Sequence, residues 1–293
     1  MALGDLFAKM FGGDKGYDLA ELTRRLDMSE ADLRAVPVSY ENFTIAKASG
    51  GRRGISAPCP ELKSLQRRIL RRLLGRLKCH WACTGFERRH SIVTNALPHV
   101  GQAIVVRMDI RNFFTATSKK RILAYFRRIG WNREAAKMLA TWCAWKGGLP
   151  QGAPTSPRLS NLLNAQLDAR LAGIARKHGA SYTRYADDMT FSFPTDDGSA
   201  ARGVIASTKN VIAQYGYKLH QGKKLRIRRR HARQLVTGLV VNTRVNLPRS
   251  TRRRLRAVEH RLAQGREATL TAEQVAGWRS LQRMVEQQGR QAG

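Results

Sequence analysis

Apolar positions recur at helical spacing in several segments of the chain. The clearest case is "ELKSLQRRILRRLLGRL", residues 61–77, in which arginines occupy one face and the opposite face carries Leu62, Leu65, Ile69, Leu73 and Leu77. This spacing predicts an amphipathic helix. Shorter patterns such as "DLAELTRRL" predict further helices up to about residue 48. The basic face of the 61–77 helix either contacts phosphate or faces water, and the pattern alone favours water.

Other segments have the composition of strands. "AIVVRMDI", residues 103–110, predicts a strand that ends on Asp109. "SYTRYADDMTFSF", residues 181–193, predicts two short strands joined by a tight turn at the two aspartates. "KKLRIRRRHARQLVTGLVVN", residues 223–242, predicts two basic strands, and the Gly-rich segment 50–58 predicts a flexible basic loop or a hairpin.

Helix-boundary residues define three later helices. Residues 155–179 predict one long helix with Ser156 as its N-cap, Pro157 in its first turn and Gly179 at its end. Helices are also expected at 198–215 and 248–265. Strands and helices are mixed without strict alternation. The pattern therefore predicts an α+β fold with helices on one face of a sheet.

The charge balance points to a polyanionic partner. The chain has 53 Lys and Arg against 21 Asp and Glu, which gives a formal net charge of +32. Nucleic acid is the expected partner, and salt should weaken its binding. The chain has no long apolar run and no signal-like N-terminus, so a membrane is not expected. A ribosomal or chaperone-type binding protein remains an alternative to an enzyme that acts on nucleic acid.

Cysteine usage fits a cytoplasmic protein. The four cysteines form no disulfide framework, and Cys79 and Cys83 have no second ligand pair at zinc-site spacing. We expect thiols kept reduced in the cytoplasm.

Two regions of the sequence carry acidic side chains that suggest chemistry. Asp109 ends a buried strand, where a lone carboxylate is costly. Beside Asp187 it would repel that carboxylate unless a cation lay between them. Magnesium prefers hard oxygen ligands, and two Mg²⁺ ions can activate a 3′-hydroxyl and stabilise leaving pyrophosphate. We expect Asp187 to ligate metal directly and Asp188 to have a weaker, partly orienting role. The alternative is an ordinary hairpin turn, in which Asp is common.

A Gly- and Pro-rich loop, "LPQGAPTSP" at residues 149–157, precedes the predicted long helix. Gly152 allows close approach of the backbone to a ligand, and Gln151 offers an uncharged hydrogen-bonding group. The following helix N-terminus favours negative charge. A structural turn would also use Gly and Pro.

"MDIRNFF" (108–114), "LPQGAPTSP" and "YTRYADDMTF" (182–191), in this order, resemble the core motifs of reverse transcriptases. The resemblance extends from about residue 53 to residue 265. "NALPH" (95–99) and "VTGLVVN" (236–242) resemble two signatures of retron reverse transcriptases. The alternatives are a loop with a hydrogen-bonded His99 and an ordinary strand with Gly238 at a bulge.

The resemblance implies a right-hand polymerase fold with fingers, palm and thumb, the palm being an antiparallel sheet backed by helices. It suggests an N-terminal helical extension at 1–50, fingers and palm at 51–225, and thumb and C-terminal helices at 226–293. It makes Asp109, Asp187 and Asp188 the catalytic, Mg²⁺-binding carboxylates. The residues expected to bind the incoming deoxynucleoside triphosphate are Arg53, Lys63, Phe114, Gln151 and Lys223. Arg52 and Arg67 lie close enough to blur the first two assignments, and Leu219 and His220 depart from the family's "LN".

The retron signatures also imply partners. The family's thumb binds the stem-loop of a cognate noncoding RNA, which serves as template and primer for a branched RNA–DNA product, multicopy single-stranded DNA. The expected RNA-binding residues are Asn95, His99, Val236, Thr237, Gly238, Arg252, Arg253, Arg254 and Arg256. A separate effector protein, a role in anti-phage defence and template removal by a host RNase H are implied as well, because too few residues follow the thumb for an RNase H domain.

Other interpretations stay open. One is a CRISPR- or defence-associated or group II-like reverse transcriptase with a different primer. Another is a non-catalytic RNA-binding protein on the same fold. The absence of a maturase or endonuclease extension argues against a full group II intron protein, and intact "QGAPTSP" argues against a diversity-generating element.

Overall fold

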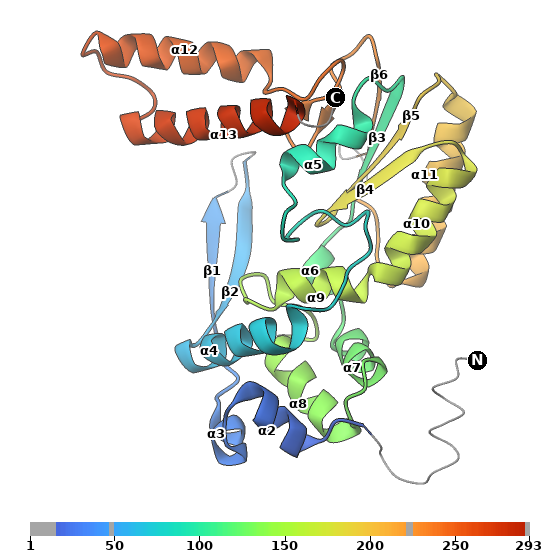
Figure 1. Cartoon of the computed structure of the whole chain (residues 1–293), viewed down its shortest axis with the longest axis vertical. Coiled ribbons are helices and arrows are strands. Elements are labelled where there is room, and N and C mark those ends of the chain that lie inside the picture. The colour runs from blue at the N-terminus through green and yellow to red at the C-terminus, as the bar shows by residue number, and fades with distance from the viewer. Residues whose placement is uncertain (1–15, 47–49, 221–224, 291–293) are drawn as a thin grey trace. The chain divides into compact units, whose positions relative to one another are not determined.

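The computed structural model describes residues 16–46, 50–220 and 225–290 (Figure 1). The chain forms two compact units. The first consists of the residues up to His80 together with Asn112–Ala165, and the second of Trp81–Arg111 together with the residues from Gln166 onward. Each unit therefore combines segments that are distant in the sequence. The domain boundaries expected at residues 50 and 225 stay predictions.

The first unit is mainly helical. It also contains a hairpin of two antiparallel strands, β1 and β2, which pair from Tyr40 opposite Pro58 to Ala46 opposite Arg52, and β1 is exposed from Glu41 to Ala46. Its elements in chain order are α2 (Leu19–Leu26), α3 (Glu30–Ala35), β1 (Tyr40–Ala46), β2 (Arg52–Pro58), α4 (Pro60–Ile69), the π-helical turn η1 (Leu70–Leu74), α6 (Phe113–Ala116), α7 (Lys119–Arg128), α8 (Arg133–Cys143) and α9 (Ser156–Leu163).

The prediction of helix up to about residue 48 is wrong for Tyr40–Ala46. This segment is strand β1, and it contains the strand formers Phe43, Thr44 and Ile45. Its partner is β2, so the segment 50–58 adopts the hairpin alternative. A strand that depends on pairing with a later segment gives only a weak local signal.

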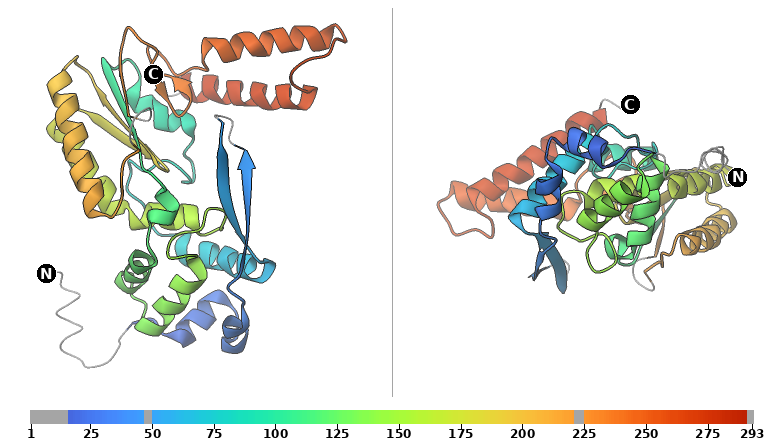
Figure 2. Two further views of the ribbon diagram at one scale, coloured as in Figure 1. Left: turned by 180° about the vertical axis from the view of Figure 1, so that it is seen from behind. Right: turned by 90° about the horizontal axis from the view of Figure 1, so that it is seen from below.

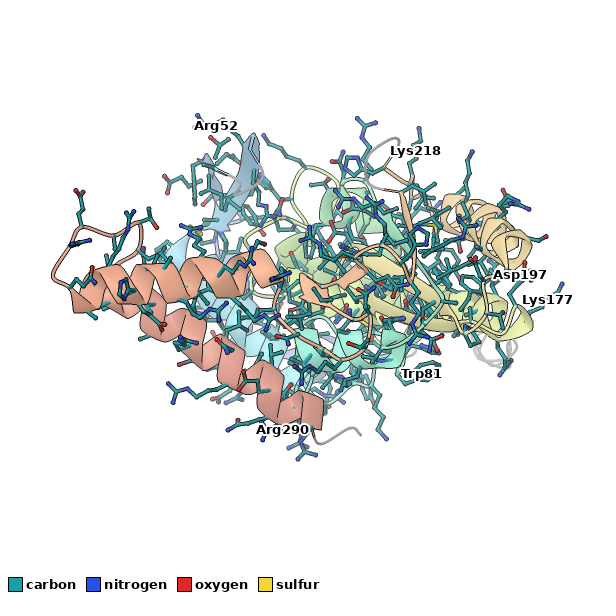
Figure 3. The ribbon with its side chains drawn as sticks, turned by 90° about the horizontal axis from the view of Figure 1, so that it is seen from above. Arg52, Trp81, Lys177, Asp197, Lys218 and Arg290 are labelled. Atoms are coloured by element: carbon teal, nitrogen blue, oxygen red, sulfur yellow. The ribbon has the colours of Figure 1, made fainter. Side chains whose placement is uncertain are left out.

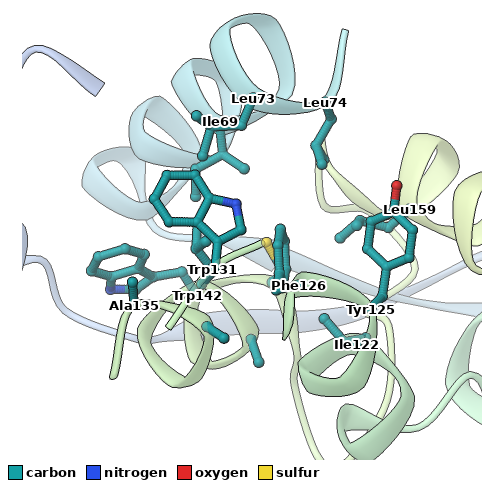
Figure 4. Packing of buried hydrophobic residues seen from close by; sticks show 14 of the residues in the cluster. Ile69, Leu73, Leu74, Ile122, Tyr125, Phe126, Trp131, Ala135, Trp142 and Leu159 are labelled. Carbon is teal, nitrogen blue, oxygen red and sulfur yellow. The ribbon is translucent and has the colours of Figure 1, made fainter. Parts of the chain in front are cut away.

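The predicted amphipathic helix at 61–77 is confirmed by α4 and η1. Leu62, Leu65, Ile69 and Leu73 are buried, and Leu77 packs partly against the same core. Figure 4 shows this core, in which Trp131, Trp142 and Phe126 lie beneath the helix. Each fully buried side chain of this size contributes roughly 1.5–3 kcal/mol of transfer free energy.

The arginine face of this helix has structural contacts. Arg68 Nη1 donates to the carbonyl oxygens of Leu26 (3.1 Å) and Asp27 (2.9 Å), where α2 ends. Arg72 Nη2 donates to the Asp27 carboxylate at 3.1 Å. Guanidinium groups at a helix C-terminus satisfy its last carbonyl groups. These two arginines therefore tie α4 and η1 to α2.

The second unit is built on a four-stranded antiparallel sheet with the strand order β4–β5–β3–β6. Helices α10 and α11 lie on one face of this sheet, as Figures 1 and 2 show. The predicted α+β architecture, an antiparallel sheet backed by helices, is confirmed. The elements are α5 (Ile92–Ala96), the 3₁₀ turn η2 (Leu97–His99), β3 (Ile104–Asp109), α10 (Ala165–Lys177), β4 (Ser181–Tyr185), β5 (Asp188–Phe193), α11 (Gly198–Gln214), β6 (Arg226–Arg229), β7 (Leu235–Val236), β8 (Leu239–Val240), α12 (Arg249–Ala263) and α13 (Ala272–Arg290).

Two predicted elements differ in detail. The long helix at 155–179 is divided at Asn164, whose Nδ2 donates to the Ser160 carbonyl at 2.7 Å and whose Oδ1 accepts from Arg121 Nη2 at 2.8 Å. Its N-cap is Thr155, so Ser156 is the first helical residue and not the cap. The described part of the segment 223–242 contains three short strands rather than two.

The opposite face of the sheet is covered by a smaller core. Val93, Val105, Val236, Leu239 and Val285 are buried together there, so α5, the β7–β8 hairpin and α13 pack against the sheet. Helices α12 and α13 run side by side, joined by an ion pair between Glu259 and Arg279 (Figure 1). The end of the sheet that carries Asp109 is described below.

Basic side chains reach the surface in both units. Figure 3 labels Arg52 on β2, Lys218 after α11 and Arg290 at the end of α13, all of them exposed. Within the described ranges, none of the helices combines the length and the apolar character that a membrane crossing requires.

Candidate active site

The candidate site begins where two central strands of the sheet pair. Asp109, the last residue of β3, lies directly opposite Asp188, the first residue of β5. Directly opposed side chains in an antiparallel pair leave the same face of the sheet, with Cβ atoms about 4.5–5.5 Å apart. The two carboxylates are partly buried, with side-chain exposures of 21% each. Asp109 therefore lies beside the aspartate hairpin, as predicted. The residue directly opposite it is Asp188, whereas the sequence suggested Asp187.

Asp188 also forms an ion pair. Arg107 precedes Asp109 by two residues on β3, so both side chains leave the same face. Arg107 Nη2 donates to Asp188 Oδ2, and its Nε lies 3.3 Å from Oδ1. This two-point contact engages both oxygens of the carboxylate and neutralises much of its charge.

Asp187 occupies the tight turn between β4 and β5. The preceding Ala186 has φ 56°, a left-handed conformation that costs a non-glycine residue roughly 1–2 kcal/mol. The Asp187 carbonyl accepts from the Ile110 backbone N–H at 2.9 Å, which ties the turn to the end of β3. Gly85 lies against the turn, because a Cβ there would be 2.6 Å from the Ala186 backbone nitrogen.

A buried polar network holds the base of this hairpin. Arg184 is fully buried and donates to both carboxylate oxygens of Asp168, at 2.7 Å each, and to the Ala186 carbonyl at 2.9 Å. The Tyr182 hydroxyl donates to Asp168 at 2.9 Å. Burial opposes the charged form of Arg184, but the Asp168 carboxylate outweighs it and raises the pKa of Arg184 well above its usual value. Burial, followed by the Asp168 charge, raises the pKa of the Tyr182 phenol, which stays protonated.

His220 lies beside Asp109. Its backbone N–H donates to the Asp109 carbonyl at 2.8 Å, and its Nε2 is 3.9 Å from Asp109 Oδ1. His220 stands where the sequence departs from the family's "LN", so this departure places an imidazole next to a candidate catalytic carboxylate.

The donor chemistry at this end of the sheet suits a hard divalent cation, because two carboxylates face the same side at adjacent positions. In the described ranges, however, no three His, Cys, Asp or Glu side chains are gathered closely enough to hold a metal ion. The residues therefore fit a magnesium ion by type, while the conformation shown keeps one carboxylate on an arginine.

The Gly- and Pro-rich loop lies in the first unit. Gly152 has φ 129°, and a Cβ there would lie 2.8 Å from the Ser56 carbonyl oxygen and 2.9 Å from Ile55 Cγ2. The Gln151 carbonyl accepts from the Ser56 N–H at 2.8 Å. Both the dihedral and the close packing require glycine. Gly152 thus allows the loop backbone to approach strand β2 closely, rather than a ligand. The side chain of the neighbouring Gln151 is half-buried.

The other expected nucleotide-binding residues of this unit differ in exposure. Arg53 on β2 and Lys63 on α4 are exposed, as a role in binding a charged ligand requires. Phe113 is buried, whereas Phe114 is half-buried at the edge of the core, with its ring 5.5 Å from the Phe113 ring in an edge-to-face arrangement. Phe113 therefore belongs to the core, whereas part of the Phe114 ring is accessible. Lys223 lies outside the described residues.

Comparison with known proteins decides the family. The family model described as reverse transcriptase (RNA-dependent DNA polymerase) matches residues 45–235. The retron Ec86 reverse transcriptase of Escherichia coli is 33% identical over 276 residues, which cover 90% of this chain and 82% of that protein. This chain belongs to the retron reverse transcriptases. The resemblance seen in the sequence motifs is thereby confirmed.

Two further relatives are longer than this chain. The retron Mx65 and Mx162 reverse transcriptases of Myxococcus xanthus are 37% and 35% identical to it, each over 78% of its length. The match covers 57% and 53% of those proteins, little more than half. A structure of telomerase from Candida albicans in complex with a fragment of telomeric RNA has a TM-score of 0.52 at 10% identity, covering 80% of this chain and 51% of that one. It supports the reverse transcriptase fold.

The retron signature "NALPH" lies inside the second unit of this chain. His99 is fully buried, with Nδ1 2.7 Å from the Ser192 hydroxyl and Nε2 2.8 Å from the Thr183 hydroxyl. Burial lowers the pKa of His99 to about 3, so the imidazole is neutral. Asn95 is also buried, and its Oδ1 accepts from the Thr84 hydroxyl at 2.6 Å. These contacts favour the alternative of a hydrogen-bonded core histidine, since neither side chain reaches the surface where RNA would bind.

The second retron signature forms the β7–β8 hairpin. Val236 is buried, while Gly238 at the tip is exposed. Thr237 has φ 47° and Gly238 has φ 85°, and the Thr237 hydroxyl donates to the Ile92 carbonyl at 2.8 Å. The segment is therefore a tight turn tied to α5, and only its tip can contact a ligand. The alternative, an ordinary strand with Gly238 at a bulge, is wrong because Gly238 lies in the turn between β7 and β8.

The basic helix α12 begins after Pro248, as predicted. Arg253, Arg254 and Arg256 are exposed on it, whereas Arg252 is half-buried with its Nε enclosed and without a hydrogen-bond partner in the described structure. The first three are placed to contact phosphate. Arg252 faces the α13 side, where it lines a cavity with Gln282 and Glu286.

Sequence reasoning missed four residues that shape the site, namely Gly85, Arg107, Asp168 and Arg184. Arg107 carried a usable signal, because a charged residue two positions before Asp109 in a strand must share its face. Arg184 carried one too, since an arginine inside an otherwise apolar strand needs a buried partner. Nothing local pointed to Asp168 or Gly85, which reach the hairpin only through the fold.

Proposed function

We propose that this chain is an RNA-directed DNA polymerase that extends a primer with deoxynucleotides. The observation that carries the proposal is the register of Asp109 opposite Asp188, with Asp187 in the adjoining turn, in a chain of the reverse transcriptase family. The reaction joins the primer 3′-hydroxyl to the α-phosphate of a deoxynucleoside triphosphate and releases pyrophosphate.

Asp109, Asp187 and Asp188 would hold magnesium in this proposal. When bound, two Mg²⁺ ions supply activation of the 3′-hydroxyl and stabilisation of the departing charge. The chain itself supplies the rigidity of the carboxylates. Asp109 is fixed by the end of β3, and the turn that bears Asp187 is fixed by Ile110 and by the buried Arg184. The backbone that bears these carboxylates is therefore held firmly, while the Asp188 side chain must exchange Arg107 for the metal.

The nucleotide-binding residues have separate roles in the proposal. Arg53, Lys63 and Lys223 bind the triphosphate, Gln151 contacts the sugar, and the Phe114 ring excludes a 2′-hydroxyl. The exposure of Arg53 and Lys63 and the half-exposed edge of Phe114 support these roles.

For the template we propose the chain's own structured noncoding RNA, in line with the retron reverse transcriptases to which it is related. The product would be multicopy single-stranded DNA joined to RNA. The tip of β7–β8 and the exposed arginines of α12 would bind the RNA stem-loop. A separate effector protein, a host RNase H, a cytoplasmic location and a role in defence against phage complete the proposal.

The activity is tested with purified protein, a primed RNA template and labelled deoxynucleotides. Magnesium-dependent incorporation that disappears when the template is omitted supports the polymerase, and tight RNA binding without incorporation supports the non-catalytic alternative. The retron-specific part needs the native locus. Nucleic acid extracted from cells that carry it should contain a branched, RNA-linked DNA, and an unbranched product would favour a reverse transcriptase with another primer.

A further inference from the structure

A cavity lined by arginines lies on the second unit, at the edge of the sheet formed by β3 and β6. Its volume is about 170 Å³, and its lining includes Val105, Leu235 and four arginines, Arg107, Arg226, Arg228 and Arg233. We call it the arginine cavity. Strand register accounts for the gathering, because Arg107 is directly opposite Arg226 and Val105 is directly opposite Arg228. Directly opposed side chains share a face, so Arg107, Arg226 and Arg228 point to the same side.

This gathering of like charges suits an anion. Four of the residues that line it carry a guanidinium group, so the cavity is strongly basic. A phosphate group can accept hydrogen bonds from several guanidinium groups at once. The cavity is also of a size to admit one tetrahedral anion, since a water molecule takes up about 30 Å³ of liquid volume.

Arg107 belongs to both the arginine cavity and the carboxylate site. Its Nη2 and Nε engage the two oxygens of Asp188, the oxygens that a divalent cation would need. A cation at Asp188 therefore competes with Arg107. If Arg107 leaves Asp188 without a new partner, it loses both contacts with that carboxylate, which is unfavourable. An anion in the cavity makes the same movement favourable.

We propose that the arginine cavity binds a phosphate of the nucleic-acid strand and that Arg107 couples this binding to cation binding at Asp188. Without the anion, Arg107 holds Asp188 and weakens its affinity for a divalent cation. With the anion bound, Arg107 turns to the phosphate and releases the carboxylate. Arg107 is thus a positioning residue that makes the carboxylate site ready only when a strand is in place. The inference rests on the proposed polymerase function.

The coupling is measurable as a change in Mn²⁺ affinity, with Mn²⁺ replacing Mg²⁺. Mn²⁺ is titrated into the full chain, and the free Mn²⁺ is measured by electron paramagnetic resonance. Three samples are compared: the chain alone, the chain with sulfate at constant ionic strength, and the chain with a template–primer duplex whose primer lacks a 3′-hydroxyl. Mn²⁺ binding by the duplex alone is subtracted. For the wild type we expect the duplex to tighten Mn²⁺ binding by at least about fivefold, the lower end of typical coupling.

Three variants separate the parts of the proposal. Arg107→Gln should bind Mn²⁺ tightly without any anion and should no longer respond to the duplex. The double variant Arg226→Gln/Arg228→Gln, altered on an exposed edge strand, should keep the weak wild-type affinity and lose the response. The matched control is Arg202→Gln/Lys209→Gln on exposed positions of α11, which removes two charges elsewhere and should respond like the wild type.

The sulfate arm identifies the source of the anion. A response to the duplex alone assigns the cavity to a strand phosphodiester, and a response to sulfate as well shows that free tetrahedral anions also reach it. The inference is overturned if wild-type Mn²⁺ affinity is unchanged by both, or if Arg107→Gln keeps the wild-type affinity and response. A protein that synthesises DNA without this coupling would contradict only the inference, whereas absence of template-dependent synthesis would contradict the proposed function.

Discussion

Arg184 donates to both oxygens of Asp168 at 2.7 Å, and neither side chain is exposed to solvent. The pair links α10 to the strand that leads into the aspartate turn, and Arg184 also binds the Ala186 carbonyl within that turn. A charge pair in the core, rather than apolar packing alone, thus fixes the position of Asp187 and Asp188.

Breaking this pair should therefore be costly. Asp168→Asn leaves the Arg184 charge buried with a weaker partner and should lower the free energy of unfolding by about 3–5 kcal/mol. The matched control is Asp196→Asn, which breaks the exposed ion pair with Arg229 and should cost at most about 1 kcal/mol. Urea unfolding of both variants checks the difference, and equal losses would show that the buried pair has no special role.

His99 should make the protein sensitive to mild acid. Its pKa is about 3 in the folded chain and about 6.5 when unfolded, so between these values the unfolded state binds more protons. The neutral imidazole therefore makes its full contribution to the free energy of unfolding above about pH 6.5. That contribution falls as the pH drops from about 6.5 toward 3. From pH 7 to pH 5 the loss should be about 2 kcal/mol.

The comparison with His99→Gln isolates this effect, because all other groups titrate in both proteins. The wild type should lose about 2 kcal/mol more than the variant between pH 7 and pH 5 in urea unfolding. An identical pH dependence would mean that His99 is accessible to protons in the folded state. Such a result would restore the hypothesis that this side chain contacts RNA.

Sequence alone predicted the elements whose signals are local. The strand ending at Asp109, the hairpin at the aspartates and the amphipathic face from Leu62 to Leu77 all follow from side-chain period. The sequence did not predict β1, because Tyr40–Ala46 becomes a strand by pairing with Arg52–Pro58.

The same limit applies to the candidate site. The aspartates could be found from composition and motif, but their exact register could not. The contact between Arg107 and Asp188 depends on that register, and the contact between Arg184 and Asp168 depends on where α10 packs. Burial of His99 was likewise invisible locally, since its two hydroxyl partners lie on β4 and β5. Each of these features requires tertiary structure.

Sugar selection should depend on Phe114 and not on its neighbour. Phe114→Val opens space at the half-buried ring and should raise the incorporation of ribonucleotides relative to deoxynucleotides, with some loss of rate. Phe113→Val removes a buried ring and should mainly destabilise, by about 1–4 kcal/mol, without changing that ratio. Single-nucleotide extension with matched triphosphates measures both. A larger change of the ribonucleotide-to-deoxynucleotide ratio in Phe113→Val than in Phe114→Val would show that Phe113 selects the sugar.

RNA affinity and RNA choice should be separable. Replacing Arg253, Arg254 or Arg256 by Gln removes an exposed charge and should weaken cognate and scrambled RNA alike, with a smaller salt dependence. Gly238→Ala adds strain at φ 85° on the exposed tip of β7–β8 and should weaken cognate RNA more than scrambled RNA. Competition between the two RNAs at two salt concentrations tests this. Equal losses for Gly238→Ala would leave the tip with a structural role only.

The central claim is that the aspartate turn performs the chemistry, and Asp187→Asn tests it most directly. Asparagine keeps the size of the side chain and the tendency to turn but removes the charge that would bind magnesium. The control is Asp27→Asn, at a left-handed helix end where asparagine is well tolerated. Template-dependent DNA synthesis should be abolished in Asp187→Asn and retained in Asp27→Asn, while both bind RNA at least as well as the wild type. Substantial synthesis by a folded Asp187→Asn protein would contradict the assignment of the site.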